Sequence, residues 1–103
     1  MNGSILIPTS FRLKGKKIRV IINDDYCKEG KLWGEADFIG NIITLCHRTH
    51  KGNVLKKSLK EKTFYHELVH HILSAMEEEE LMYNEDFVEK FACLLYQYEK
   101  TKQ

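Results

Sequence analysis

The sequence has few of the features that mark disordered or membrane-spanning chains. Its 103 residues include one proline and six glycines, which is not the composition of a disordered chain. No apolar run in the sequence approaches the roughly 20 residues that a transmembrane helix needs. The apolar stretch at residues 5–7 is short and follows no charged segment, so we expect no signal peptide.

The cysteines are too few and too irregular for a disulfide framework. Cys27, Cys46 and Cys93 are an odd number and form no C-x-x-C pair. Reduced thiols are typical of cytosolic proteins. We therefore expect three free thiols and a cytoplasmic protein.

The chain also lacks a strong net charge. Lysine and arginine number 16 against 15 acids, which gives a formal charge of +1 and no field that attracts nucleic acid or an anionic membrane. Lysines gather at 14–17 and 56–62, and acids at 77–89. Because no aromatic residues alternate with the lysines to stack on bases, we expect neither nucleic acid nor a membrane as a partner.

The length allows one small domain. A chain of 103 residues can bury a single core but leaves little room for a separate substrate-binding lobe. The hydrophobic fraction is 43% and the charged fraction 30%, as in ordinary soluble globular proteins. We predict a single domain over residues 1–103, acting as a monomer.

Two segments predict β-hairpins. Residues 11–13 and 17–23 are rich in apolar and β-branched side chains and flank Gly15, which suits a tight turn. Residues 33–46 repeat this pattern around Gly40–Asn41. The polar segment between the hairpins reads as a connection with room for a helical turn.

Helical spacing of apolar residues then predicts two helices, over about 55–76 and 85–98. The second helix carries apolar residues at 88, 91, 92, 95 and 98, and we expect this side to pack on the first helix. Residues 99–103 are expected to fray. The chain is therefore predicted to be an α+β domain, with a small, twisted, mainly antiparallel sheet packed against these two helices.

The first helix contains the most informative motif. His66-Glu67-Leu68-Val69-His70 reads H-E-x-x-H, and residues four apart share one helix face, so His66 and His70 can hold one zinc ion. The ion lowers the pKa of a water molecule to about 7. Glu67, next along the helix, can take the proton from that water and pass it to a leaving amine.

A catalytic zinc takes a third protein ligand, and no histidine follows His71. The ligand must then be a carboxylate, and the run at 77–80 lies too close to the motif helix to fold back over it without a turn. Glu85 starts a separate helix, in line with residues 88, 89 and 92 on the stripe expected to face the motif helix. The candidates are Glu77, Glu78, Glu79, Glu80, Glu85, Asp86 and Glu89, and this placement favours Glu85.

The motif together with the segment 84–92, Asn-Glu-Asp-Phe-Val-Glu-Lys-Phe-Ala, resembles the gluzincin pattern. The Phe91–Ala92 pair is similar to the ImmA/IrrE-type metallopeptidases and the minigluzincins, which are common in phages and other mobile elements. The resemblance implies a minimal zincin-like metallopeptidase domain with a zinc cofactor, working in the host cytoplasm if a phage encodes it. It makes Glu85 the third ligand.

The resemblance also implies a supporting role for Glu89, in the place of a family Asn or Asp that holds a ligand histidine. Two residues depart from the family pattern. Val88 stands where the family often has alanine, and Glu89 is longer than the usual residue.

The sequence thus predicts a zinc metalloendopeptidase that acts on a protein or peptide. An extended substrate is expected to pair with an edge strand around Ile42–Cys46, at Ile43, Thr44 and Leu45. The residue that stabilises the oxyanion is left open among Tyr26, His71 and Tyr83. The alternative is a non-catalytic zinc module that binds a regulatory protein, against which Glu67 argues because a structural site needs no base.

Overall fold

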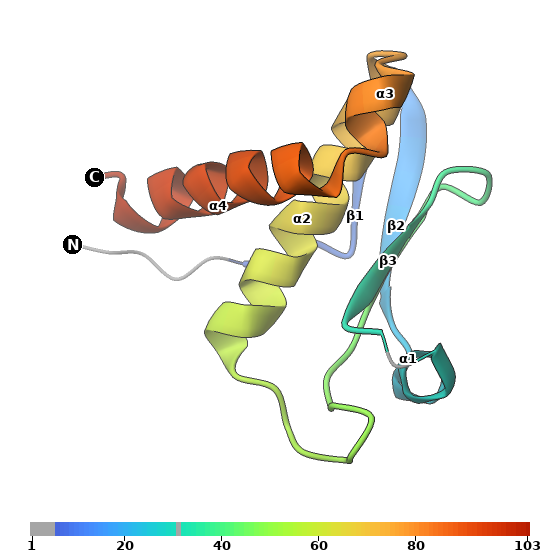
Figure 1. Cartoon of the computed structure of the whole chain (residues 1–103), viewed down its shortest axis with the longest axis vertical. Coiled ribbons are helices and arrows are strands. Elements are labelled where there is room, and N and C mark those ends of the chain that lie inside the picture. Colours follow the sequence, from blue (N-terminus) through green and yellow to red (C-terminus); the bar gives the residue numbers. More distant parts are fainter. Residues whose placement is uncertain (1–5, 31) are drawn as a thin grey trace.

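The computed structural model describes residues 6–30 and 32–103. The described residues form a sheet on which one long helix packs, and a second long helix crosses the first on its other side (Figure 1). The elements in chain order are β1 (Ser10–Leu13), β2 (Lys16–Ile22), α1 (Asp24–Gly30), β3 (Gly34–Asp37), β4 (Ile42–Leu45), α2 (Lys57–Ala75), α3 (Glu79–Met82) and α4 (Glu85–Thr101). The α+β prediction is confirmed.

The sheet consists of both predicted hairpins. Strand β1 pairs antiparallel with β2, and β3 pairs antiparallel with β4. Lys14 and Gly15 turn the first hairpin with positive φ angles of 50° and 76°, as a tight turn of this kind requires. The hairpins join through β2 and β4, which run parallel. The sheet is therefore mixed. The sequence did not predict this parallel pairing, because the pattern of a hairpin does not show how it pairs with another hairpin.

The strand order β1-β2-β4-β3 overturns one prediction. Strand β4 is not an edge strand, because it pairs with β2 on one side and β3 on the other. Its residues Ile43, Thr44 and Leu45 are all buried and have no free edge for a substrate. The edge strand on this side is β3, the other arm of the same hairpin.

The two long helices lie close to where the sequence placed them. Helix α2 begins two residues later than predicted and ends one residue earlier. Helix α4 starts at Glu85 but continues to Thr101, so the expected fraying from residue 99 is wrong. Lys100 explains the extra turn, because its Nζ lies 3.4 Å from Glu61 Oε1 of α2 and ties the end of α4 to the core.

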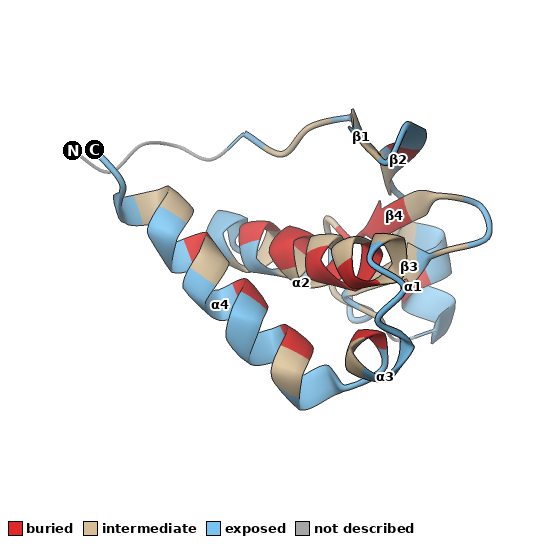
Figure 2. Cartoon of the chain, turned by 90° about the horizontal axis from the view of Figure 1, so that it is seen from above, coloured by how far each residue is buried: buried red, intermediate tan, exposed pale blue. Residues whose placement is uncertain are grey.

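The core lies on both sides of α2, which is sandwiched between the sheet and α4 (Figure 2). Helix α4 contributes a buried stripe of Val88, Ala92 and Tyr96, spaced four apart. Phe91 and Tyr98 point outward and are 51% and 60% exposed. The predicted packing side of α4 was therefore too broad, because a small residue at 92 and a long one at 96 define a narrower contact.

The expectation of three free thiols is also wrong. Cys27 of α1 and Cys46, which follows β4, form a disulfide and are both buried. The two residues come together because β2 and β4 are parallel neighbours whose carboxyl ends lie at the same edge of the sheet. Cys93 is exposed and free. Among the described residues, no helix combines the length and apolar character needed to cross a membrane.

Candidate metal centre

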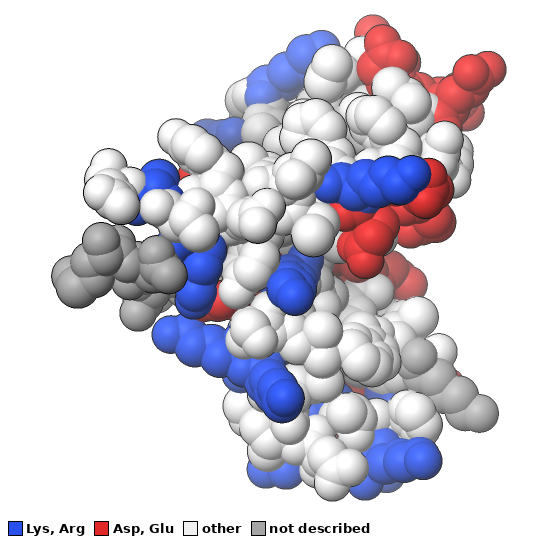
Figure 3. All heavy atoms as spheres, turned by 60° about the vertical axis from the view of Figure 1, so that its left-hand side comes forward, with Lys and Arg blue, Asp and Glu red and all other residues white. Residues whose placement is uncertain are grey.

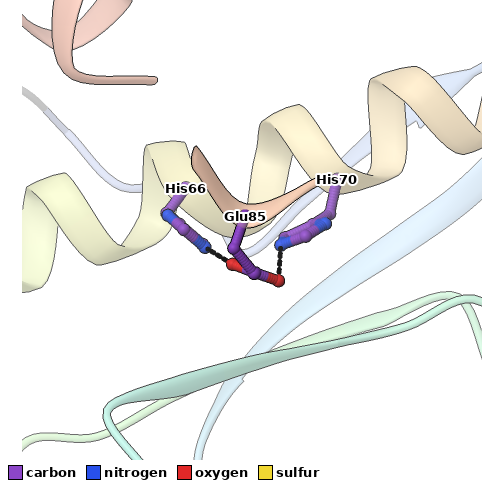
Figure 4. A group of neighbouring side chains, drawn as sticks. All are labelled: His66, His70 and Glu85. Carbon is purple, nitrogen blue, oxygen red and sulfur yellow. Dashed lines mark hydrogen bonds and ion pairs between the residues drawn. The ribbon is translucent and has the colours of Figure 1, made fainter. Parts of the chain in front are cut away.

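The candidate site lies where the start of α4 passes over the middle of α2. His66 and His70 project from consecutive turns of α2, and Glu85 is the first residue of α4 (Figure 4). Asn84 caps α4, since its side-chain oxygen accepts a hydrogen bond from Phe87 N at 3.0 Å. This cap fixes the start of the helix and with it the position of Glu85.

The three side chains converge on one point (Figure 4). His66 Nε2 lies 3.0 Å from Glu85 Oε2, and His70 Nε2 lies 3.2 Å from Glu85 Oε1. One ligand atom from each residue falls within 4.8 Å of the others. The structure therefore brings together a group that can hold a metal ion, made of the three residues that the sequence singled out. The remaining acids of the 77–89 segment are not part of this group.

Both histidines are oriented through their other ring nitrogen. His70 Nδ1 lies 2.7 Å from the carbonyl oxygen of Met82, and His66 Nδ1 lies 3.1 Å from Glu89 Oε1. Oxygen atoms of these kinds accept hydrogen bonds, so each Nδ1 carries the proton and donates it. In the neutral rings, each Nε2 then presents a lone pair to Glu85, which suits metal binding.

The arrangement of His66, His70 and Glu85 suits a bound cation. Two Nε2 lone pairs that face a carboxylate at 3.0 and 3.2 Å repel it unless a proton or a metal ion lies between them. Burial on its own would lower the pKa of His66, but hydrogen bonds to Glu89 and Glu85 and the charge of Glu67 raise it overall. Two imidazoles and one carboxylate are also a ligand set that zinc accepts.

Glu67 lies beside this group and differs from its members in being buried without a partner among the described residues. Its side chain is only 7% exposed, and among residues 6–30 and 32–103 it forms no hydrogen bond or ion pair of its own. Burial raises the pKa of Glu67 to about 7, with nearby Glu85 and Glu35 adding to the rise and His66 opposing it. A carboxylate with this pKa can both take up and release a proton near neutral pH.

The edge strand β3 approaches Glu67 at a glycine. A Cβ atom on Gly34 would lie 3.2 Å from Glu67 Oε2 and 3.3 Å from the carbonyl oxygen of Thr44, and closer still to the Thr63 side chain. Any larger residue would push β3 away from α2. Gly34 was missed in the sequence, where it reads only as the start of a strand.

A cleft runs between β3 and the two helices on either side of Glu67. Two cavities of about 400 and 310 Å³ share Gly34, His66 and Glu67 in their walls. We call the larger one the Trp33 half and the smaller one the Phe38 half. Apart from the shared residues and the candidate metal group, the Trp33 half is lined by Trp33, Leu59, Lys62, Thr63, Glu89 and Cys93, and the Phe38 half by Glu35, Ala36, Phe38 and Tyr83.

The three residues considered for the oxyanion occupy different places. His71 is buried and its Nε2 lies 3.2 Å from the carbonyl oxygen of Ile42, on the sheet side of α2. Tyr26 donates its hydroxyl hydrogen to Glu35 Oε1 at 2.7 Å. Tyr83 lines the Phe38 half together with His66 and His70 and is 66% exposed. Of the three, Tyr83 alone lines the cleft.

Two groups orient the histidines, and only one of them was expected from the sequence. Glu89 lies next to His66, as the resemblance implied. The Met82 carbonyl, which orients His70, was not foreseen, since a backbone oxygen leaves no trace in the sequence.

The comparisons with family models, with curated proteins and with solved structures found no match to this chain.

Proposed function

We propose that the chain is a zinc-dependent metallopeptidase of the gluzincin type. The observation that carries the proposal is the arrangement of His66, His70 and Glu85, in which two oriented imidazoles face one carboxylate within 4.8 Å. Beside them, Glu67 faces the adjoining cleft without a partner among the described residues. A structural metal site has no use for a buried base beside it.

The roles of the residues follow from their positions. Zinc held by His66, His70 and Glu85 would supply a nucleophile from water and polarise the peptide carbonyl. Glu67 takes the proton from the attacking water and returns it to the leaving nitrogen, because its carboxylate lies in the cleft beside the candidate metal group. Met82 and Glu89 hold the two imidazoles in the required orientation. Of Tyr26, His71 and Tyr83, Tyr83 is the best placed to stabilise the oxyanion, because it lines the same cavity as His66 and His70.

The substrate is proposed to be a protein or peptide in extended form. Strand β3 borders both cavities through Gly34 and is the edge of the sheet on this side. An added strand can pair with its free backbone groups. This replaces the pairing with Ile43, Thr44 and Leu45 that the sequence suggested.

The metal assignment is tested by zinc analysis of the purified protein. We expect about one zinc per chain, because three ligands define one site, and loss of the metal from the double variant His66→Ala/His70→Ala. Stoichiometric zinc in the double variant would show that the metal is held elsewhere.

The choice of Glu85 is tested by comparing three glutamates. Glu85→Gln should lower zinc affinity most, in competition with a chelator at fixed pH. Glu89→Gln should cost about 10- to 100-fold, because Glu89 contacts His66 rather than the metal. Glu78→Gln is the control and should change little, as Glu78 lies outside the group. Zinc retained by Glu85→Gln but lost from Glu78→Gln would contradict the assignment.

Hydrolysis of unfolded casein, abolished by a chelator and restored by zinc, tests the activity itself. The alternative is a zinc-containing module that binds a regulatory protein without cleaving it. That alternative predicts zinc binding without any hydrolysis.

A monomeric state and a lack of affinity for nucleic acid remain predictions. So does the cytoplasmic location, although the disulfide Cys27–Cys46 weakens its basis because such bonds are rare in the cytosol.

A further inference from the structure

The two halves of the cleft differ in charge once the candidate metal group and Glu67 are set aside. The Trp33 half retains two residues of opposite charge, Lys62 and Glu89, beside Trp33 and Leu59. The Phe38 half retains a single charged residue, the acid Glu35, beside Phe38 and Tyr83. On the face drawn in Figure 3, acidic side chains gather toward the upper right, whereas lysine and arginine side chains are spread more widely.

Glu35 is held in place but not neutralised. The Tyr26 hydroxyl donates a hydrogen bond to Glu35 Oε1 at 2.7 Å, which restricts the carboxylate. This bond raises the pKa of Tyr26, so the hydroxyl keeps its proton and remains a donor. None of the ion pairs formed among the described residues includes Glu35. The carboxylate is therefore held in position and has no cationic partner within residues 6–30 and 32–103.

The second acid of β3, Asp37, is engaged in the turn of the hairpin. Asp37 Oδ1 accepts hydrogen bonds from Ile39 N at 3.0 Å and Gly40 N at 2.9 Å. Its carboxylate thus shapes the turn of the hairpin. Of the two acids on the edge strand, Glu35 lines the cleft and Asp37 does not.

We propose that the Phe38 half of the cleft selects a lysine or arginine side chain of the substrate, with Glu35 as the carboxylate that pairs with it. The inference rests on the proposed peptidase function, since it concerns the peptide that the same cleft binds. A cationic residue opposite Glu35 on an added strand forms an opposite-charge cross-strand pair, whereas an acid there is repelled. The aromatic rings of Phe38 and Tyr83 line the same cavity and suit the long stem and the charge of such a residue.

Binding is measured on zinc-loaded Glu67→Gln protein, which should hold peptides without cutting them. The probes are fluorescent decapeptides of one uncharged host sequence, with lysine, glutamine or glutamate at each position in turn. We expect at least one position where the lysine peptide binds roughly 5- to 10-fold more tightly than the glutamate peptide. Added Glu35→Gln should bring this ratio close to one, and Glu35→Lys should reverse it. Asp25→Asn is the control, since Asp25 is an exposed acid of neighbouring α1 outside the cleft, and it should keep the ratio.

Equal affinity of lysine and glutamate peptides at every position, or no binding of any peptide, would overturn the inference. So would a preference that survives Glu35→Gln. Casein hydrolysis by the wild-type protein tests the proposed function separately. Hydrolysis without charge selection leaves the peptidase and removes the inference, whereas charge selection in the binding assay without hydrolysis supports the inference and removes the peptidase.

Discussion

Glu61 and Glu67 are two buried glutamates on the same helix, and their surroundings are opposite. Glu61 is 0% exposed and Glu67 7%. Glu61 Oε1 accepts the hydroxyl of Tyr96 at 3.0 Å and lies 3.4 Å from Lys100 Nζ, so it joins α2 to α4. Glu67 faces the cleft with no partner among the described residues. Equal burial therefore does not imply an equal role: a paired carboxylate holds the fold together, and an unpaired one is left free for chemistry.

The largest expected effect separates the two residues by activity. Glu67→Gln should reduce hydrolysis by about 100- to 10,000-fold, because the amide keeps the shape but cannot accept the proton. Zinc content should be unchanged. Glu61→Gln is the matched control and should keep most of the activity, since Glu61 lies outside the cleft. Initial rates on casein, measured at equal zinc occupancy, decide the matter, and a fully active Glu67→Gln protein would refute the proposed base.

The second effect separates them by stability. Glu61→Ala should lower the free energy of unfolding by about 3 kcal/mol, because it leaves Tyr96 and Lys100 without their partner in a buried contact. The estimate is at the lower end of the usual range since Lys100 is partly exposed, at 35%. Urea unfolding of the zinc-loaded protein measures the change. If Glu61→Ala unfolds at the same urea concentration as the wild type, the contact between α2 and α4 has been overrated.

The third effect uses pH on the zinc-free protein. The pKa of Glu67 is raised from 4.5 to about 7, so the folded state holds this proton more tightly than the unfolded state. Its contribution to stability is complete below pH 4.5 and is lost as the pH rises through 7. We expect Glu67→Gln to gain roughly 2 to 3 kcal/mol over the wild type between pH 5 and pH 8. A difference in unfolding free energy that stays constant over this range would contradict the raised pKa.

Of the two buried glutamates, only Glu67 was singled out from the sequence. The offset of four between His66 and His70 places both on one helix face, and Glu85 starts the next helix as predicted. The proposed role of Glu67 follows from its position next to His66 in the sequence. These are local relations, and a helix repeats them faithfully.

The parts that were missed depend on contacts between distant segments. Glu61 looks like one more surface charge until α4 brings Tyr96 and Lys100 to it, 35 and 39 residues further along the chain. The parallel pairing of β2 with β4 makes β3 the edge strand and brings Cys27 to Cys46. No local pattern reports on such pairings, so the substrate strand and the thiols were wrongly predicted.

The smallest expected effect asks how much of the Glu61 contact is due to a single hydroxyl. Tyr96→Phe removes the donor at 3.0 Å but keeps the ring that packs in the core. Glu61 Oε1 would keep only Lys100, and Oε2 is already buried without a partner among the described residues. A hydrogen bond to a charged group typically contributes about 1.5 to 3 kcal/mol, and we expect a loss near the lower value since Lys100 remains.

Tyr65→Phe is the matched control for this last change. Tyr65 is also buried in the core, with its ring centroid 5.9 Å from that of Tyr96, but its hydroxyl has no hydrogen-bond partner among the described residues. The loss of that hydroxyl should therefore change the free energy of urea unfolding by less than about 0.5 kcal/mol. Equal losses in Tyr65→Phe and Tyr96→Phe would mean that the tyrosine hydroxyls matter only through general polarity. A loss confined to Tyr96→Phe would establish that Glu61 stabilises the fold through this bond, which is the role that Glu67, six residues further along the same helix, does not have.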